Sequence, residues 1–338
     1  MYLYLILTVF SIFTVVCQMV PVVGFADVLT SPFSKLSVNF TGSNNLLLRD
    51  SFTVSPTIAE KSADFGWELN SVSCNGTFCT VTQARPLGKN GPFLYAVKQL
   101  NSEWCHSSVG KSIINREAEL GRIISHPHIV PTLDEMTDGG DPYLVQPWLQ
   151  GKTLKEFLAL GRTAKPTEVI WIARQIAEAL TALEKRGVCH SDVKPSNIIV
   201  SPNGHATLID LGLARQMGEP SLPIDIAIVG TPQYMAPELA DTSHPIDIRS
   251  DLYSLGLVML EMLFGKTIRS AIGMPQRVNA GQWHTHWESL ICRANRQQQW
   301  LADLEVLLLA MTDLNAAKRP DSADVLVRQL ISIELAAV

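Results

Sequence analysis

Charged side chains are scarce in this chain of 338 residues. Asp, Glu, Lys and Arg make up 17% of it, against about 25% in an average globular protein. Hydrophobic residues make up 46%, and the formal net charge is −5. Intrinsic disorder requires few apolar residues and a high net charge, so the composition excludes it. It also argues against binding of nucleic acid through bulk positive charge, and we expect no nucleic-acid partner.

Cysteine is also rare, with six residues in the whole chain. That density is too low for a small scaffold held together by disulfides. A length of 338 residues allows roughly two domains or lobes. The composition therefore indicates a folded protein that contains an unusually apolar part.

The start of the chain supplies some of that apolar character. Residues 2–26 contain no charged side chain, and about 20 apolar residues span a bilayer as a helix. We therefore expect residues 1–26 to form a transmembrane anchor or signal-like segment with one hydrophobic helix. The first basic residues, Lys35 and Arg49, favour a cytoplasmic location for the rest of the chain. A cleaved export signal and a misassigned start codon are the alternatives, although the basic start of a secretory signal is missing.

Two blocks of different pattern follow residues 27–64, a Ser-, Thr- and Asn-rich stretch that we interpret as a linker. Residues 65–146 mix short strand-like runs with one helical stretch, whereas the chain from residue 151 onward is mainly helical. Apolar residues recur at helical spacing over 166–186, and 251–264 is apolar nearly all round, as in a buried helix. The sequence therefore predicts an α+β fold with a small β-rich part and a larger helical part.

Acidic and amide side chains stand close together in residues 190–197. Asp192 and Asn197 come directly before an apolar run, and Asp210 ends the next apolar run. Magnesium prefers oxygen ligands, which carboxylates and an amide carbonyl supply. The pattern therefore predicts a magnesium and phosphate site on turns beside the ends of strands.

The same segment resembles the catalytic loop of eukaryotic-type protein kinases. By that resemblance Asp192 is the catalytic base, while Asn197 and Asp210 bind the metal. Lys194 stands where the Ser/Thr-specific form of the loop has a lysine that contacts the transferred phosphate. The resemblance therefore implies an enzyme that uses ATP and Mg²⁺.

Further landmarks of that family occur in the expected order. Lys98 resembles the lysine that pairs with the ATP phosphates, and Glu117 stands at the position of its ion-pair partner. Residues 230–238 resemble the substrate-docking end of the activation loop, and Arg319 stands where the family has the arginine that pairs with Glu238.

The resemblance also implies the remaining residues of the nucleotide site and the lobes of the fold. The positions that line this site are Gly76, Val81, Ala96, Gln146 (the gatekeeper), Trp148 and Ile199. A bilobal kinase domain over residues 65–335 is implied, with the N-lobe at 65–146 and the C-lobe at 151–335.

The glycine-rich loop departs from the family pattern. Of its three glycines only Gly76 remains, because Cys74 and Cys79 occupy the other two positions. A Cβ there obstructs close approach of the backbone to phosphate, so a pseudokinase that acts only as a binding module is the alternative to an active enzyme. A redox-sensitive cysteine pair is a further alternative, but we favour two small loop residues.

Two other departures concern regulation. Ser191 replaces the arginine that usually precedes the catalytic Asp and binds a phosphate on the activation loop. Residues 213–229 contain one hydroxyl side chain, Ser221, so we expect a loop that needs no phosphorylation. Gly121 stands where a bulky residue usually packs under the helix of Glu117, which predicts a loosely held helix.

We therefore expect a membrane-anchored Ser/Thr protein kinase with its catalytic domain in the cytoplasm. Its partners are expected to be ATP, protein substrates with Ser or Thr acceptors, and the membrane through its N-terminal segment. The alternatives are the pseudokinase binding module and an exported protein.

Overall fold

The computed structural model describes residues 66–136, 141–219, 233–240, 245–265, 287 and 299–338. Apart from residues 202–204, these belong to one compact unit. The expected anchor with its hydrophobic helix, residues 1–26, and the expected linker, residues 27–64, lie outside the described residues. Among the helices that the structure describes, none is long and apolar enough to cross a membrane.

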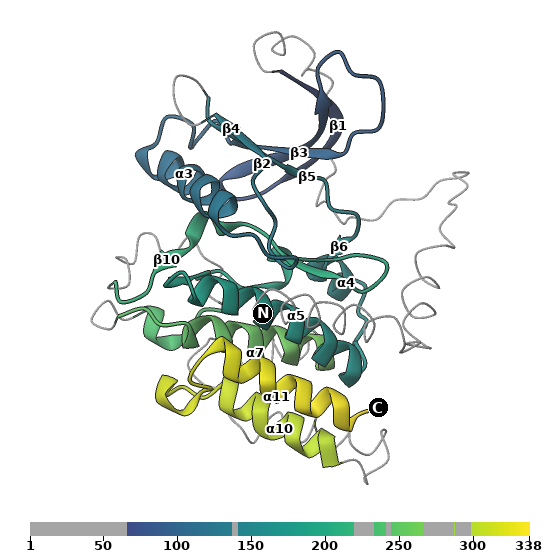
Figure 1. Ribbon diagram of the computed structural model, residues 1–338, viewed down its shortest axis with the longest axis vertical. Helices are drawn as coiled ribbons and strands as arrows, with labels where there is room; N and C mark the ends of the chain where they lie inside the picture. Colours follow the sequence, from purple (N-terminus) through teal and green to yellow (C-terminus); the bar gives the residue numbers. More distant parts are fainter. Residues whose placement is uncertain (1–65, 137–140, 220–232, 241–244, 266–286, 288–298) are drawn as a thin grey trace, which may run out of the picture. The chain divides into compact units, whose positions relative to one another are not determined.

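A five-stranded antiparallel sheet forms the N-terminal part of the unit (Figure 1). Its strands are β1 (Trp67–Asn75), β2 (Cys79–Pro86), β3 (Tyr95–Leu100), β4 (Asp134–Met136) and β5 (Tyr143–Pro147). Their order is β1-β2-β3-β5-β4, with Val81 opposite Lys98 and Ala96 opposite Gln146. Since side chains alternate along a strand, these four residues share one face of the sheet.

Helix α3 (Ser108–Ile123) packs against that sheet. Ser107 caps its start, because its hydroxyl accepts a hydrogen bond from the backbone N–H of Val109. On the helix Ile114 and Ala118 are buried with Leu144 of β5 in one apolar cluster. The helix that carries the expected ion-pair glutamate is therefore fixed to the sheet by apolar packing.

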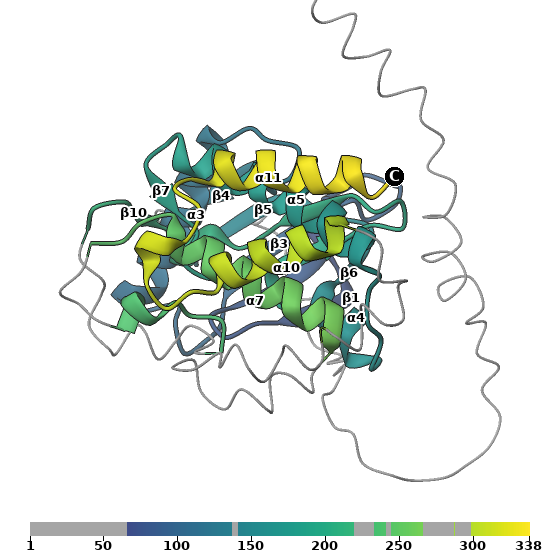
Figure 2. The ribbon, with the colours of Figure 1, turned by 90° about the horizontal axis from the view of Figure 1, so that it is seen from below.

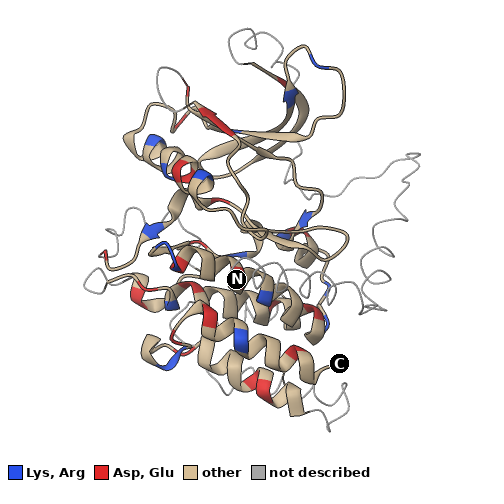
Figure 3. Cartoon of the chain, in the orientation of Figure 1, with Lys and Arg blue, Asp and Glu red and all other residues tan. Residues whose placement is uncertain are grey.

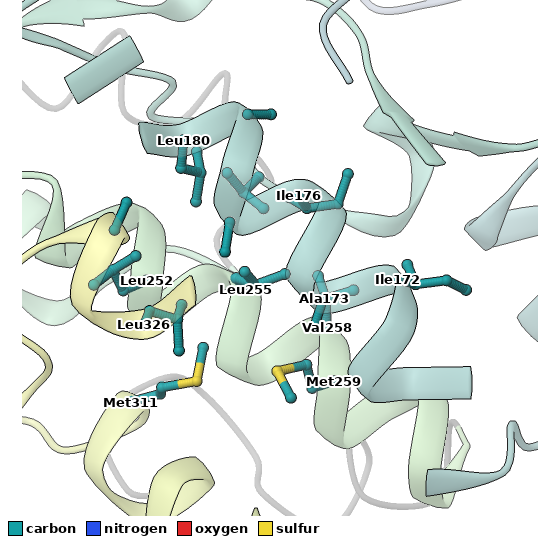
Figure 4. Close-up of a cluster of buried hydrophobic side chains, with 14 of the residues drawn as sticks. Ile172, Ala173, Ile176, Leu180, Leu252, Leu255, Val258, Met259, Met311 and Leu326 are labelled. Atoms are coloured by element: carbon teal, nitrogen blue, oxygen red, sulfur yellow. The ribbon is translucent and has the colours of Figure 1, made fainter. Parts of the chain in front are cut away.

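The C-terminal part is mainly helical. Its helices include α4 (Leu154–Ala159), α5 (Pro166–Glu184), α7 (Arg249–Phe264), α10 (Gln299–Met311) and α11 (Ala323–Ala336), which Figure 2 shows from below. Apolar side chains of α5, α7, α10 and α11 meet in the core, as Figure 4 shows for Ile176, Leu255, Met311 and Leu326. Nearly every residue of α7 is buried, as its apolar pattern predicted. The helices expected at 166–186 and 251–264 are thus confirmed to within two residues at each end.

Short strands in the C-terminal part hold the loops of the candidate site. β6 (Lys152–Thr153), β8 (Ile198–Val200) and β9 (Ala206–Leu208) form one sheet, and β7 (Val188–Cys189) pairs with β10 (Arg215–Gln216). Asn197 lies directly before β8, and Asp210 follows β9 by two residues. The antiparallel pairing of β8 and β9 brings the two loops together, and the N–H of Ile209 donates to the carbonyl of Asn197 at 2.9 Å.

This arrangement confirms the predicted α+β class, with a β-rich part that carries one main helix and a larger helical part. Charged side chains are thinly spread over both parts, as the mostly uncharged ribbon of Figure 3 shows. The low content of charged residues therefore extends to the folded unit and is not confined to residues 1–26 of the chain.

Candidate active site

A buried lysine connects the sheet, helix α3 and the loop after β9. Lys98 is 6% exposed, and its Nζ lies 2.5 Å from Glu117 Oε2 and 2.8 Å from Asp210 Oδ1. Burial alone lowers the pKa of Lys98, but the attraction of the two carboxylates outweighs this and raises it. Lys98 therefore stays charged, and its ammonium group joins strand β3 to Glu117 of α3 and to Asp210 of the loop after β9.

Asp210 is the most accessible of these three side chains, at 40% exposed. Burial raises its pKa, but the ion pair and hydrogen bond with Lys98 outweigh that effect and bring the pKa to about 2. The backbone of Asp210 has a φ of +70°, a left-handed conformation that is unfavourable for residues other than glycine. Such strained residues cluster at functional sites. The loop thus presents an ionised carboxylate toward solvent.

Asp192 is held in its loop by two neighbouring side chains. Lys194 Nζ lies 2.6 Å from Asp192 Oδ2, and Asn197 Nδ2 donates to both the carbonyl and Oδ2 of Asp192 at 2.9 Å. Burial raises the pKa of Asp192, and Lys194 counteracts this. Because Asn197 uses its N–H₂ group for Asp192, its carbonyl oxygen remains an acceptor for a ligand.

The backbone of this loop is anchored from helix α7. The buried carboxylate of Asp251 accepts hydrogen bonds from the N–H of His190 at 2.6 Å and from the N–H of Ser191 at 2.8 Å. Ser191 has a φ of +65°, and its buried hydroxyl has no partner among the described residues. Burial raises the pKa of Asp251 to about 6. In the sequence, Asp251 is an acidic residue near the start of a mostly apolar helix.

Gln146 supports the buried pair from strand β5. It is 7% exposed, and its Nε2 donates to Glu117 Oε1 at 3.1 Å. Glu117 is therefore held through both carboxylate oxygens, by Lys98 on one side and by Gln146 on the other. The sequence predicts that Gln146 lines the nucleotide site. The structure adds a hydrogen bond to Glu117 that the sequence did not indicate.

The other expected nucleotide residues are divided between the two parts of the unit. Val81 and the buried Ala96 lie on the sheet face of Lys98, and Ile199 lies half-buried on β8. The backbone N–H of Trp148 is not available to a nucleotide, because it donates to the carbonyl of Leu94 at 2.8 Å. Pro147 has no N–H, and the N–H of Trp148 is already used. Leu149 is therefore the first residue after Gln146 whose N–H has no acceptor among the described residues and is available to a ligand. Sequence reasoning did not name Leu149, because it depends on the use of the preceding donor.

The turn between β1 and β2 is built around the one remaining glycine of the expected loop. The N–H of Gly76 donates to the carbonyl of Cys79 at 2.8 Å, and a Cβ at Gly76 would lie 3.2 Å from that oxygen. Cys74 and Cys79 are both free, with Cys74 exposed and Cys79 buried. Burial raises the pKa of the Cys79 thiol to about 12, which makes it a poor nucleophile. These findings favour the interpretation of two small loop residues over a redox pair.

Gly121 packs closely against a neighbouring segment, a contact that the expectation of a loosely held helix did not include. The N–H of Thr132 donates to the carbonyl of Gly121 at 3.0 Å, and a Cβ at Gly121 would collide with the Thr132 side chain. Glycine therefore lets the last turn of the helix pack directly against the segment before β4. The expected regulatory hydroxyl, Ser221, lies outside the described residues.

Comparison with known proteins agrees with this geometry. Residues 69–331 match the family model described as the protein kinase domain. Because this match covers well over half of the chain, the chain belongs to the protein kinase family, and the resemblance seen in its sequence is confirmed. Membership implies the use of ATP and a divalent metal ion.

Bacterial Ser/Thr kinases are among the similar proteins. The chain is 32% identical over 213 residues to the serine/threonine-protein kinase PknD of Mycobacterium tuberculosis, across 63% of this chain and 32% of PknD. It is 34% identical over 206 residues to PknB of Mycolicibacterium smegmatis, across 59% of this chain and 32% of that protein. With PknB of Mycobacterium leprae the identity is 30% over 243 residues, or 70% and 38% of the two chains. The chain thus spans about a third of the length of these relatives.

Proposed function

We propose that the chain is an ATP-dependent protein kinase that phosphorylates Ser or Thr residues of protein substrates. The observation that carries this proposal is the buried Lys98, whose ammonium joins Glu117 of α3 to Asp210 of the loop after β9. A lysine fixed in this way supplies a permanent positive charge for the phosphates of a nucleotide. Phosphoryl transfer depends mainly on such positioning and charge neutralisation.

The loop around Asp192 supplies the groups for the acceptor. The Asp192 carboxylate accepts the proton of the substrate hydroxyl and directs its oxygen to the phosphate. Lys194, whose Nζ is 2.6 Å from Asp192 Oδ2, places a second positive charge at the point of transfer. Asn197 holds the orientation of Asp192 through its two hydrogen bonds.

The residues present also fit a divalent metal ion, which we propose to be Mg²⁺. Asp210 offers a partly exposed, ionised carboxylate and Asn197 an amide oxygen, and Mg²⁺ prefers oxygen ligands. Among the described residues no group of three or more His, Cys, Asp or Glu side chains is placed to hold a metal, so Asp210 and Asn197 need further ligands. When bound, the ion supplies neutralisation of the phosphate charges.

The proposal is tested by incubating the full chain with Mg²⁺, γ-labelled ATP and a protein substrate rich in Ser, Thr and Tyr. We expect label on Ser or Thr, and no label when the metal is removed with a chelator. Label on Tyr would contradict the proposed specificity. ATP binding without any transfer would support the pseudokinase alternative instead.

We also propose that residues 1–26 anchor the chain in a membrane and leave the kinase domain in the cytoplasm. The support is the uncharged stretch at 2–26 and the first basic residues after it, Lys35 and Arg49. A reporter fused after Val338 that is active only in the cytoplasm should give a signal in a membrane fraction. A signal from a reporter that is active only outside the cytoplasm, fused at the same place, would contradict this orientation.

A further inference from the structure

Asn101, the residue after β3, bonds to successive carbonyl groups of the turn between β1 and β2. Its side-chain Nδ2 donates to the carbonyl of Gly76 at 3.0 Å and to that of Thr77 at 3.3 Å. Its backbone N–H donates to the carbonyl of Phe78 at 2.8 Å. One residue thus holds three consecutive peptide groups of the turn that replaces the glycine-rich loop.

These bonds fix where the N–H groups of the turn point. The C=O and N–H of a trans peptide point in opposite directions, and the described residues contain no cis peptide. Since the carbonyls of Gly76 and Thr77 are directed at Asn101, the N–H groups of Thr77 and Phe78 face away from it. Neither N–H has an acceptor among the described residues. Successive N–H groups on one side of a turn are donors suited to a phosphate.

Neighbouring contacts hold Asn101 and the turn in place. The Thr80 hydroxyl lies 2.9 Å from Asn101 Oδ1 and 2.9 Å from Asn75 Oδ1. A hydroxyl has one proton, so it orients the Asn101 amide whenever it donates to Asn101 rather than to Asn75. The ring of Phe78 packs edge-to-face on Trp104, with centroids 4.9 Å apart, and the N–H of Trp104 donates to the carbonyl of Asn101 at 2.8 Å. A Cβ at Gly110 would collide with the carbonyl of Trp104, so this segment lies directly on the first turn of α3.

We propose that Asn101 is a positioning residue that holds the N–H groups of Thr77 and Phe78 ready for the phosphates of ATP. This inference rests on the proposed kinase function. Glycines allow such a loop to adapt to the phosphates, whereas here two of them are replaced by cysteines and the turn is held by side-chain bonds instead. A pre-organised turn loses less conformational freedom when the nucleotide binds.

The test compares nucleotides with and without phosphates on the full chain. In Asn101→Ala we expect the Kd for Mg²⁺-ATP, measured by calorimetry, to rise about tenfold, as expected for the loss of about two hydrogen bonds that orient the donors. The Kd for adenosine, which has no phosphate, should change less than about twofold. Asn70→Ala is the control, because Asn70 lies on β1 and its side chain bonds Gln83 and not the turn.

The outcomes separate this inference from the proposed function. If the wild type binds no ATP, the proposed function is contradicted. If the wild type binds ATP and Asn101→Ala binds it equally well, or loses ATP and adenosine affinity equally, the role of Asn101 is contradicted. Should Asn101→Ala fail to fold, Thr80→Val removes the hydroxyl that lies 2.9 Å from both Asn101 Oδ1 and Asn75 Oδ1. About a threefold loss of ATP affinity is then expected. An unchanged ATP affinity in Thr80→Val would then contradict the inference.

Discussion

Replacing Asp192 with Asn is expected to lower the rate of phosphate transfer by about 10²–10⁴-fold, the usual contribution of a general base. Asn has nearly the same shape as Asp, but its amide is not basic and cannot accept the proton of the substrate hydroxyl. The carboxylate also compensates the charge of Lys194, 2.6 Å away. The measurement is kcat with saturating Mg²⁺-ATP and protein substrate.

Two controls accompany this variant. Asp303→Asn makes the same change at an exposed position on α10 and should leave kcat unchanged. The Kd of Asp192→Asn for Mg²⁺-ATP should stay close to that of the wild type, because we propose that Asp192 acts on the acceptor and not on the nucleotide. Equal kcat values for Asp192→Asn and the wild type would show that Asp192 is not the base.

Replacing Arg319 with Met is expected to destabilise the fold by about 3–5 kcal/mol, the cost of leaving a buried charge without its partner. The Arg319 side chain is fully buried, and its guanidinium bonds both carboxylate oxygens of Glu238, at 2.6 and 2.9 Å. It also lies over the ring of Tyr253 at 4.7 Å and donates to the carbonyl of Asp313. Met fills much of the same volume but leaves Glu238 without its main partner.

Urea unfolding measures this effect against a matched control. Arg328→Met removes a surface ion pair with Asp324 on α11, and exposed pairs contribute at most about 1 kcal/mol. Equal losses of unfolding free energy in the two variants would contradict a structural role for the Arg319 pair.

The same pair predicts a pH dependence. Burial raises the pKa of Glu238, but Arg319 outweighs this and lowers it below its ordinary value of 4.5. A carboxyl with a depressed pKa stabilises the fold above its unfolded-state pKa, and the stabilisation is lost as the pH falls further. The wild type should therefore lose more stability below pH 4.5 than Arg319→Met does.

Much of the fold could be predicted because its signals are local. The apolar periodicity of α5 and the nearly continuous apolar character of α7 each reflect burial against neighbouring helices. The proximity of Asp192 and Asn197 was also predictable, since they are five positions apart in one loop. Their expected roles came from the resemblance to protein kinases.

The remaining details depend on contacts between distant parts of the chain. Gln146 meets Glu117 across 29 positions, so its sequence position gave no indication of this partner. The absence of a bulky side chain at Gly121 predicted a loose helix, whereas it allows close packing against Thr132. The sequence did not single out Asn101, because its proposed role depends on hydrogen bonds to a turn that begins 25 positions earlier, at Gly76.

The central claim is that this site transfers phosphate although its loop retains one glycine of three. The most direct test is the time course of γ-phosphate transfer from Mg²⁺-ATP to Ser and Thr of a protein substrate, for the wild type beside Asp192→Asn. We expect steady transfer by the wild type and a rate at least about 10²-fold lower for the variant. Identical time courses for the two proteins would contradict it.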